Sequence, residues 1–463
     1  MKRSIEPCER LRCGSRLSAA SGCIALVLCV WLAGCSGGSS AAAAPGSNPS
    51  GGTGPDGSGG GQGQSSPVIY VSETSQSFGS GNAGGTFSGL IEAFDLNVNS
   101  GVLSPIPGSP FPTNFSTGGD MALAPHGAAA YVLAQNYPAG TCCVGSTSLL
   151  VYALDPASGT PTLKQALTTD ASEVGTIAVN FSGHFLYVAP YSDSSGDTGI
   201  GIFTVQSNGT VVFTNFVQAQ SDGGAAITPN GAFLYTHSDG APVGNPGSNP
   251  CGPVTSNLWG FSINSTTGAL TAVAGSPFVF QRDVCEVGTA PQYVATQIDP
   301  AGKRLFVVDS GNATVTVFAI DPSTGALTPL PGSSKDSSVG GFYASVIDPM
   351  GRFLYVGSAV YSFTGFSLTA NTTSGVLPLM PGMPVQVTPA PTDDEASTTM
   401  AIDSSGAFLF SNENEFTSAF SCCGPDALVE FKINPNTGAL TQLPSTPITL
   451  AGAASRIVAA PPR

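Results

Sequence analysis

Residues 294–330 read VATQIDPAGKRLFVVDSGNATVTVFAIDPSTGALTPL, and this stretch decides the fold. It contains four short apolar or β-branched runs, which end at Ile298, Val308, Ile320 and Leu330. The turns inside the first pair of runs and inside the last pair carry Asp, Pro and Gly, the residues that tight reversals favour. Runs of this kind between such turns are typical of β-strands. The stretch therefore predicts a four-stranded antiparallel meander.

The same unit recurs along the chain. Its second turn repeats with a Gly at positions 101, 159, 209, 268, 325, 375 and 438. Its first turn repeats with a Gly at 127, 183, 231, 302, 351 and 406, and it introduces the strands AAAYV, HFLYV, AFLYT, KRLFV, RFLYV and AFLFS. The first copy is incomplete, because Val68–Val71 reads as a second strand with no first strand before it. The segment Arg456–Val458 supplies a first strand after the seventh unit.

These repeats predict an all-β fold, a seven-bladed β-propeller of four-stranded antiparallel blades. The C-terminal strand would join the N-terminal blade and close the ring, which leaves few open sheet edges. The folded span, 67–463, provides roughly 57 residues per blade, enough for four strands and their loops. A β-helix is the main alternative, but its repeats are far shorter.

The composition agrees with a β-rich chain. The 463 residues include 59 Gly and 37 Pro, and only 9% are charged, which disfavours long helices. Hydrophobic residues reach 41%, so the chain can bury a large core. The formal net charge of −15 argues against nucleic acid as a partner, because phosphates attract basic surfaces.

The N-terminal segment has the pattern of an export signal. Basic residues precede a short apolar run at 24–32, and the run ends in Leu-Ala-Gly-Cys, with Cys35 last. This order resembles the lipobox of bacterial lipoproteins, which implies removal of residues 1–34 and acylation of Cys35. An ordinary signal peptide with an incidental Cys is the alternative.

Residues 35–66 predict a flexible tether, because they are almost entirely Gly, Ser, Ala, Pro, Asn and Gln. Ser36 follows the lipobox Cys, and the resemblance to lipoproteins then favours the outer membrane. We expect an exported protein that a lipid anchor holds to the bacterial envelope.

Several segments resemble one family of propellers. The unit ends SGVLSPIPGSPF (100–111), TGALTAVAGSPF (267–278) and TGALTPLPGS (324–333), with the strand GRFLYV (351–356), are similar to the lactonase-like seven-bladed propellers related to bacterial 6-phosphogluconolactonase and to the fungal carboxymuconate lactonising enzyme. The resemblance covers nearly all of 67–463 and implies this fold and lactone hydrolysis. Where relatives begin an inner strand with Gly-Pro-Arg-His, this chain reads Ala-Pro-Gln-Tyr, with Tyr293 last.

In such a meander both short turns lie on one face, and the long irregular connections lie on the other. Those connections are 72–89, 134–147, 237–257, 279–293, 384–397 and 412–427. Binding residues concentrate on such loops, so we expect function on this loop face. Most of the 29 acidic residues are assigned to it, which predicts a field that attracts cations or basic partners. Simple solubility is the alternative explanation of this acidity.

Few loop-face residues suit catalysis. His237 ends the second strand of the fourth unit, and Arg282 and Glu286 follow on the next loop, so these three form the candidate catalytic set. The candidate ligand-binding residues are charged side chains assigned to the same face, namely Asp120, Glu173, Asp222, Asp309 and Arg456.

The densest acidic run is the candidate metal site. Asp393, Asp394 and Glu395 offer the oxygen ligands that Ca²⁺ prefers, although they match no EF-hand pattern. A solvated loop is the alternative interpretation. We expect no other cofactor.

Six Cys remain beyond the signal and Cys35, an even number that suggests disulfides in an exported chain. Cys251 and Cys285 both lie at the loop-face edge of the fourth unit, so we predict that they pair. The adjacent pairs Cys142-Cys143 and Cys422-Cys423 either form vicinal bridges or crosslink two loops, and the sequence leaves both options open.

The leading interpretation is a monomeric, lipid-anchored, extracytoplasmic propeller. Its acidic loop face would bind a cationic ligand, a glycan or another envelope protein. The alternative is a lactone hydrolase that acts on an uncharged or cationic lactone. A purely architectural envelope component is a third possibility.

Overall fold

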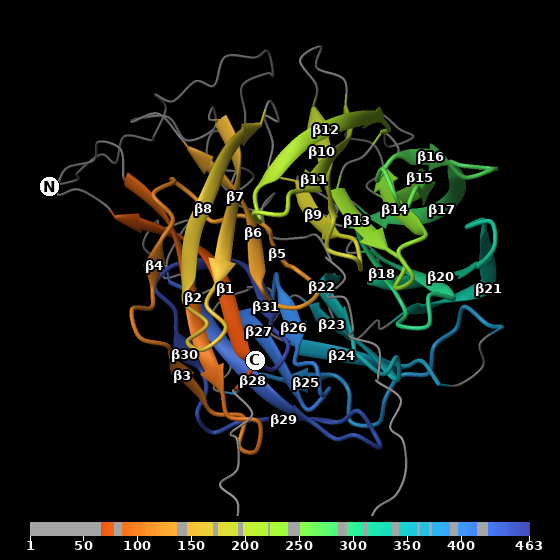
Figure 1. Ribbon diagram of the computed structural model, residues 1–463. Coiled ribbons are helices and arrows are strands. Elements are labelled where there is room, and N and C mark those ends of the chain that lie inside the picture. Colours follow the sequence, from red (N-terminus) through yellow and green to blue (C-terminus); the bar gives the residue numbers. More distant parts are fainter. Residues whose placement is uncertain are drawn as a thin grey trace, which may run out of the picture.

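The chain is described by a computed structural model over residues 66–77, 86–136, 146–169, 175–192, 198–220, 223–238, 251–285, 294–309, 313–335, 342–358, 362–369, 373–388, 397–413 and 425–463. Within these ranges the residues form strands and turns and no helix. The described strands make seven antiparallel sheets, arranged as blades around a common centre (Figure 1). The predicted seven-bladed propeller is confirmed.

Each blade is numbered by its order in the chain, and its strands are given from the centre outward. Blade 1 contains β31 (Ala453–Ala459), β1 (Val68–Ser77), β2 (Thr86–Leu96) and β3 (Leu103–Pro105), with β4 (Phe111–Pro112) against β2. Blade 2 contains β5 (Met121–Leu123), β6 (Ala129–Asn136), β7 (Ser146–Leu154) and β8 (Pro161–Thr169). Blade 3 contains β9 (Thr176–Val179), β10 (Phe185–Ser192), β11 (Thr198–Val205) and β12 (Val211–Gln218).

The remaining blades follow the same order. Blade 4 contains β13 (Gly223–Ile227), β14 (Phe233–Ser238), β15 (Cys251–Ile263) and β16 (Leu270–Ala272), with β17 (Phe278–Cys285) against β15. Blade 5 contains β18 (Val294–Ile298), β19 (Arg304–Asp309), β20 (Thr314–Ile320) and β21 (Leu327–Lys335). Blade 6 contains β22 (Phe342–Ile347), β23 (Phe353–Ser358), β24 (Ser362–Ser367) and β25 (Val385–Gln386). Blade 7 contains β26 (Met400–Ile402), β27 (Phe408–Glu413), β28 (Ala427–Ile433) and β29 (Leu440–Gln442), with β30 (Ile448–Thr449) against β28.

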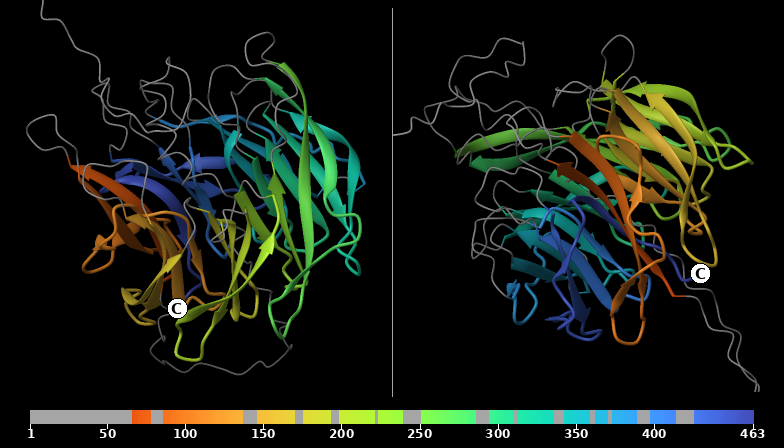
Figure 2. Two further views of the ribbon diagram at one scale, coloured as in Figure 1. Left: turned by 90° about the horizontal axis from the view of Figure 1, so that it is seen from above. Right: turned by 90° about the vertical axis from the view of Figure 1, so that its left-hand side faces the viewer.

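The ring closes where the two ends of the folded chain meet. Strand β31 pairs antiparallel with β1, so that Ile69 lies opposite Ala459 and Val71 lies opposite Ile457. The red-orange start of the folded chain and its blue end therefore lie side by side (Figure 2). The predicted closure by the C-terminal strand is confirmed.

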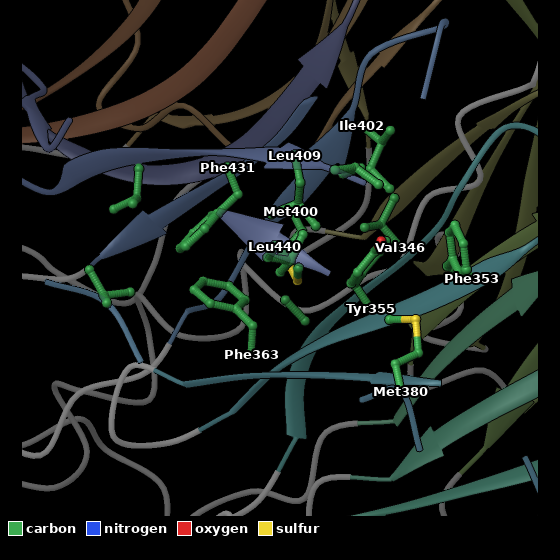
Figure 3. Packing of buried hydrophobic residues seen from close by; sticks show 14 residues of the cluster. Val346, Phe353, Tyr355, Phe363, Met380, Met400, Ile402, Leu409, Phe431 and Leu440 are labelled. Atoms are coloured by element: carbon green, nitrogen blue, oxygen red, sulfur yellow. The ribbon is translucent and has the colours of Figure 1, made fainter. Parts of the chain in front are cut away.

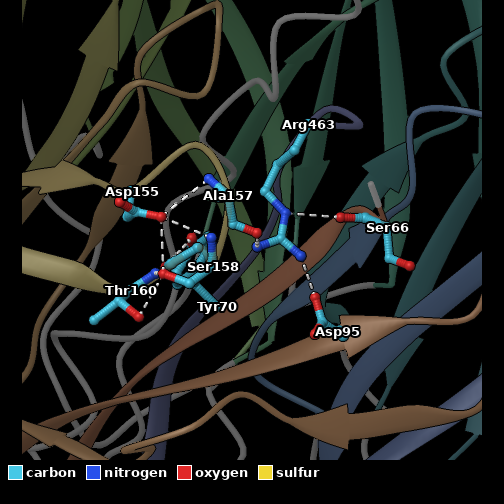
Figure 4. Close-up of polar contacts among 9 residues, drawn as sticks. Ser66, Tyr70, Asp95, Asp155, Ala157, Ser158, Thr160 and Arg463 are labelled. Atoms are coloured by element: carbon cyan, nitrogen blue, oxygen red, sulfur yellow. Dashed lines mark hydrogen bonds and ion pairs between the residues drawn. The ribbon is translucent and has the colours of Figure 1, made fainter. Parts of the chain in front are cut away.

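Arg463, the last residue, makes further contacts between these ends (Figure 4). The Arg463 guanidinium donates from Nε to the carbonyl oxygen of Ser66 at 3.0 Å and from Nη1 to that of Ala157 at 3.1 Å. Its Nη2 forms an ion pair with Asp95. One side chain thus connects the C-terminus to blade 1 and to a short turn of blade 2.

The hydrophobic core is divided among the blade interfaces. The described residues form seven buried clusters, each shared by two neighbouring blades. Figure 3 shows the cluster between blades 6 and 7, where the rings of Phe363 and Phe431 meet edge to face with centroids 4.9 Å apart. Full burial of such a side chain stabilises the fold by about 1.5–3 kcal/mol. Each blade is therefore held mainly by its two neighbours.

The recurring turn residues have local causes. In the first turn, Asp348 accepts a hydrogen bond through Oδ1 from the backbone N–H of Phe353 at 2.8 Å, and Asp403 does the same for Phe408 at 2.8 Å. In the second turn, Gly268 has φ +70°, and a Cβ atom there would lie 2.4 Å from the Phe185 ring. A left-handed backbone and the neighbouring ring together require glycine.

The two kinds of short turn lie on one rim. Arg352, in a first turn of blade 6, donates from Nη1 to the carbonyl oxygen of Pro435, in a second turn of blade 7, at 2.9 Å. The opposite rim, where β14 and β19 end, is called the loop rim. The described residues include no helix long and apolar enough to cross a membrane.

Candidate functional site

A buried ion pair lies where the inner strands of blades 1 and 2 meet. Arg456 belongs to β31, and Asp120 immediately precedes β5. Arg456 Nε lies 3.4 Å from Asp120 Oδ1, and the two side chains are 10% and 2% exposed. The other carboxylate oxygen accepts a hydrogen bond from the backbone N–H of Ile177, in β9 of blade 3, at 2.7 Å. Asp120 therefore links three consecutive blades.

Burial controls the proton affinity of this carboxyl group. It raises the pKa of Asp120 to about 6, because burial disfavours the charged form. The Arg456 guanidinium and the backbone amides of Ile177 and Met121 act in the opposite sense. The desolvation by burial is the largest of these effects, so the net result is a raised pKa.

Two threonines repeat this contact elsewhere in the ring. Thr176, the first residue of β9, accepts through Oγ1 from the N–H of Ala225 in blade 4 at 3.1 Å. Thr399, just before β26, accepts from the N–H of Ile457 in blade 1 at 3.0 Å. A side-chain oxygen at the start of one inner strand thus binds the next inner strand. In blade 2 the same position carries a carboxylate paired with an arginine.

His237 lies at the loop-rim end of β14, as the sequence predicts, but in the interior of the protein. It is 4% exposed, and its ring packs on Gly224, where a Cβ atom would lie 3.1 Å from His237 Cε1. The same Cβ atom would lie 3.2 Å from Thr296 Oγ1 on β18, so His237 faces the junction of blades 4 and 5.

The other members of the candidate catalytic set stay predictions. The backbone of Arg282 pairs with Val254 between β17 and β15, but its side chain lies outside the described residues. Glu286 lies outside them altogether. Of the three candidate catalytic side chains, the structure therefore describes that of His237.

The candidate ligand-binding residues divide in the same way. Asp309 ends β19, is 3% exposed, and pairs across the sheet with Val294 and Thr314. Glu173 and Asp222 lie outside the described residues. Asp120 and Arg456 are in direct contact.

The candidate metal and lipid residues are not described. Asp393, Asp394, Glu395 and Cys35 all lie outside the described ranges. Among the residues that are described, no group of three or more His, Cys, Asp or Glu side chains is arranged to hold a metal ion. The calcium site remains a prediction.

The backbone supports one cysteine pair. Cys251 and Cys285 lie directly opposite each other in the antiparallel pairing of β15 with β17, a placement compatible with a disulfide. Their side chains are not described, so the bridge stays a prediction. Cys142, Cys143, Cys422 and Cys423 lie outside the described ranges.

The loop-face acidity needs one correction. Five of the carboxylates assigned to that face have described side chains, and all five are buried with at most 6% exposure: Glu73, Asp120, Asp309, Glu413 and Asp426. Glu73, Asp309 and Glu413 belong to strands β1, β19 and β27, and Asp120 and Asp426 immediately precede β5 and β28. An exposed acidic field therefore rests on the remaining acidic residues of that face.

Sequence reasoning missed a carboxylate cluster at the ring closure. Glu73 of β1, Glu92 of β2 and Asp426 before β28 are 0%, 8% and 1% exposed. Glu92 and Asp426 both act on the proton affinity of Glu73, so the three groups are electrostatic neighbours. The available signal was a Glu in each of two paired strands, β1 and β2.

Comparisons with known proteins bear on the fold. No family model and no curated protein matches the sequence. A solved structure of a periplasmic gluconolactonase from Pseudomonas aeruginosa is 16% identical with a TM-score of 0.59, and the match covers 86% of this chain and 99% of that one. A protein from Bacteroides uniformis, provisionally assigned as a 6-phosphogluconolactonase, is 15% identical with a TM-score of 0.57 over 86% of this chain and 100% of that one.

This chain has the lactonase-like seven-bladed propeller fold. A third solved structure agrees, a provisionally assigned 6-phosphogluconolactonase from Bacteroides fragilis, which is 14% identical with a TM-score of 0.57 over 87% of this chain and 99% of that one. The resemblance stated from the unit ends is confirmed for the fold. Identities this low carry the architecture and not the activity.

Proposed function

We propose that this protein is a lactone hydrolase that acts at the loop rim, near the centre of the ring. The observation that carries the proposal is the match of its propeller to the gluconolactonase of Pseudomonas aeruginosa over 99% of that chain. Loops on a rigid scaffold are the usual place for such a site.

The chemistry requires two kinds of group. A water oxygen attacks the lactone carbonyl carbon, the ring C–O bond breaks, and the ring oxygen takes a proton to give a hydroxy acid. A general base must activate the water, and a positive charge or hydrogen-bond donor must stabilise the oxyanion. His237 is the candidate base, and Arg456, held by Asp120, is the candidate cation at the inner strands.

The charge of the protein favours an uncharged or cationic lactone. Its formal net charge is −15, and a field of that sign repels anions such as phosphorylated sugars. Repulsion of this kind lowers association rates and is reduced by salt.

The test is hydrolysis of a lactone panel by the purified protein. The panel contains an uncharged sugar lactone, its phosphorylated counterpart, and simple five- and six-membered lactones. His237→Ala should lower kcat/KM about 10²–10⁴-fold if it removes a general base. His184→Ala is the matched control, because His184 is exposed at a short turn on the opposite rim and should leave the rate unchanged.

Folding must be checked in parallel, because His237 is buried. His237→Gln, which keeps a polar side chain of similar size, should fold like the wild type and lose the same activity. A wild type that is inactive on every member of the panel contradicts the proposal. That result would favour the alternative, a propeller that binds a cationic ligand, glycan or envelope protein.

We also propose that the hydrolase works outside the cytoplasm, anchored by a lipid on Cys35. The support is the order of basic residues, apolar run and lipobox-like Leu-Ala-Gly-Cys in the sequence. One of the solved proteins of this fold is itself named periplasmic.

A further inference from the structure

The ring closure depends on a short segment, Leu450–Ala454, which leads from blade 7 into β31. Asp426 holds this segment by three hydrogen bonds. The backbone N–H of Asp426 donates to the carbonyl of Gly452 at 3.0 Å, and the N–H of Leu450 donates to the carbonyl of Asp426 at 2.8 Å. The carboxylate of Asp426 accepts from the N–H of Ala454 at 2.8 Å.

Blade 1 holds the same segment from the other side. The carboxylate of Glu92 accepts a hydrogen bond from the N–H of Ala451 at 2.8 Å. Glu73 lies opposite Ala454 in the pairing of β1 with β31, next to an irregularity in the register. A Cβ atom on Gly452 would lie 2.7 Å from the carbonyl oxygen of Thr74, so β1 and the segment are in close contact.

Three carboxyl groups therefore surround this segment, one each from β1, β2 and the start of β28. The other charged side chains of the neighbouring elements are Asp95 on β2, Glu413 at the end of β27, Glu430 and Lys432 on β28, Asp120 before β5 and Arg456 on β31. Arg456, the cation of β31, is paired with Asp120. The charges that act most on Glu73 are the carboxylates of Glu92 and Asp426.

We propose that this closure is a pH-sensitive latch: the ring is held most firmly while Glu73 carries a proton, and loss of that proton loosens β31 from β1. With Glu73 ionised, three negative charges would surround Leu450–Ala454 in the interior. Buried like charges repel strongly, because little water is present to screen them. Separation of β31 from β1 admits water and relieves this repulsion.

The proton affinity of Glu73 agrees with this geometry. Burial, and next the charge of Glu92, raise its pKa from the usual 4.5 to about 9. The backbone amides of Gly452 and Ala451 act in the opposite sense. In the unfolded chain Glu73 loses its proton near pH 4.5, whereas in the folded chain it keeps the proton to about pH 9. Its contribution to stability is therefore complete below pH 4.5 and is lost as the pH rises to 9.

Hydrogen bonds also connect the latch to the chain just before Asp120, which pairs with Arg456 on the inner strands. The carbonyl oxygen of Glu73 accepts a hydrogen bond from the N–H of Gly118 at 3.1 Å, and Ser455 of β31 donates through Oγ to the Gly118 carbonyl at 2.5 Å. Gly118 lies two residues before Asp120. Loosening of β31 would therefore disturb the pair of Asp120 with Arg456. This inference stands on the closure geometry and does not depend on lactone hydrolysis.

The experiment compares hydrogen exchange of β31 amides with that of β14 and β19 amides at pH 6, 7.5 and 9, as protection factors corrected for intrinsic exchange. In the wild type, protection of β31 should fall as the pH rises while protection of β14 and β19 changes less. The fall can reach about tenfold per pH unit for one proton. In Glu73→Gln, which cannot ionise, the extra fall of β31 should disappear.

Glu430→Gln is the matched control. Glu430 is also fully buried, on the blade 7 side of the closure, and burial raises its pKa to about 7. Its substitution should leave the loss of β31 protection between pH 7.5 and 9 intact. The proposal is overturned if β31 and the control strands respond alike in the wild type, or if Glu73→Gln keeps the full pH dependence.

Discussion

At the scale of single residues, tyrosine hydroxyl groups join neighbouring blades. The hydroxyl of Tyr235 donates to the carbonyl of Gly325 in the second turn of the next blade at 2.8 Å. Tyr70, Tyr187 and Tyr355 make the equivalent bonds to Gly159, Gly268 and Gly438 at 2.6–2.9 Å. The two recurrent signatures of the sequence, the strand with Tyr and the turn with Gly, therefore contact each other across blades.

Replacement of one hydroxyl tests this contact. Tyr235→Phe should lower the free energy of unfolding by about 1–2 kcal/mol, because it leaves the buried Gly325 carbonyl without this donor. Urea denaturation at constant pH measures the change. Tyr131 is the control, since it occupies the same strand position in blade 2 and the described residues provide its hydroxyl with no hydrogen-bond partner. Equal losses for Tyr131→Phe and Tyr235→Phe would contradict the role given to the bond.

At the scale of elements, β31 is the strand on which the architecture depends. It is distant in sequence from β1, yet it supplies the innermost strand of the same blade. Its Ile457 is 1% exposed and belongs to the cluster shared by blades 7 and 1. Without β31, the inner edge of β1 and that cluster would be open to water, and an open edge invites pairing with other chains.

Truncation after Gly452 removes β31 and should abolish cooperative thermal unfolding or cause aggregation. The loss of a strand and its buried side chains is large against a typical stability of about 5–15 kcal/mol. Truncation after Ala460 is the control, because it keeps β31 and removes Pro461, Pro462 and the contacts of Arg463. It should lower Tm by a few degrees. A soluble, cooperative protein ending at Gly452 would show that closure is dispensable.

At the scale of the whole molecule, the proposed lipid anchor sets where the propeller works. Cys35→Ser should move the protein from the membrane fraction to the soluble fraction and abolish incorporation of labelled fatty acid. Cys29→Ser, in the apolar run of the signal, is the control and should leave both unchanged. Retention of label in Cys35→Ser would contradict the anchor.

The sequence by itself determined the fold, because the same pattern of short strands and tight turns recurs along it. The turns need their Gly or Asp for local backbone reasons, as Gly268 and Asp348 show, and the four strand runs of 294–330 are apolar or β-branched. The first unit lacks its first strand, and the C-terminal segment after the seventh unit supplies one. This arrangement predicts a closed ring. His237 was likewise placed correctly at the end of its strand.

Only the tertiary structure decided which polar residues meet. Asp120 contacts Arg456 and Ile177, and Glu73 lies beside Glu92 and Asp426, through contacts between blades that no local pattern encodes. Burial then changed the proton affinity of these groups. Acidic residues assigned to an exposed face lie in the interior, and burial raises the pKa of Glu73 to about 9. The physical reason is that charge and turn preferences are local properties, whereas desolvation depends on which blade covers a side chain.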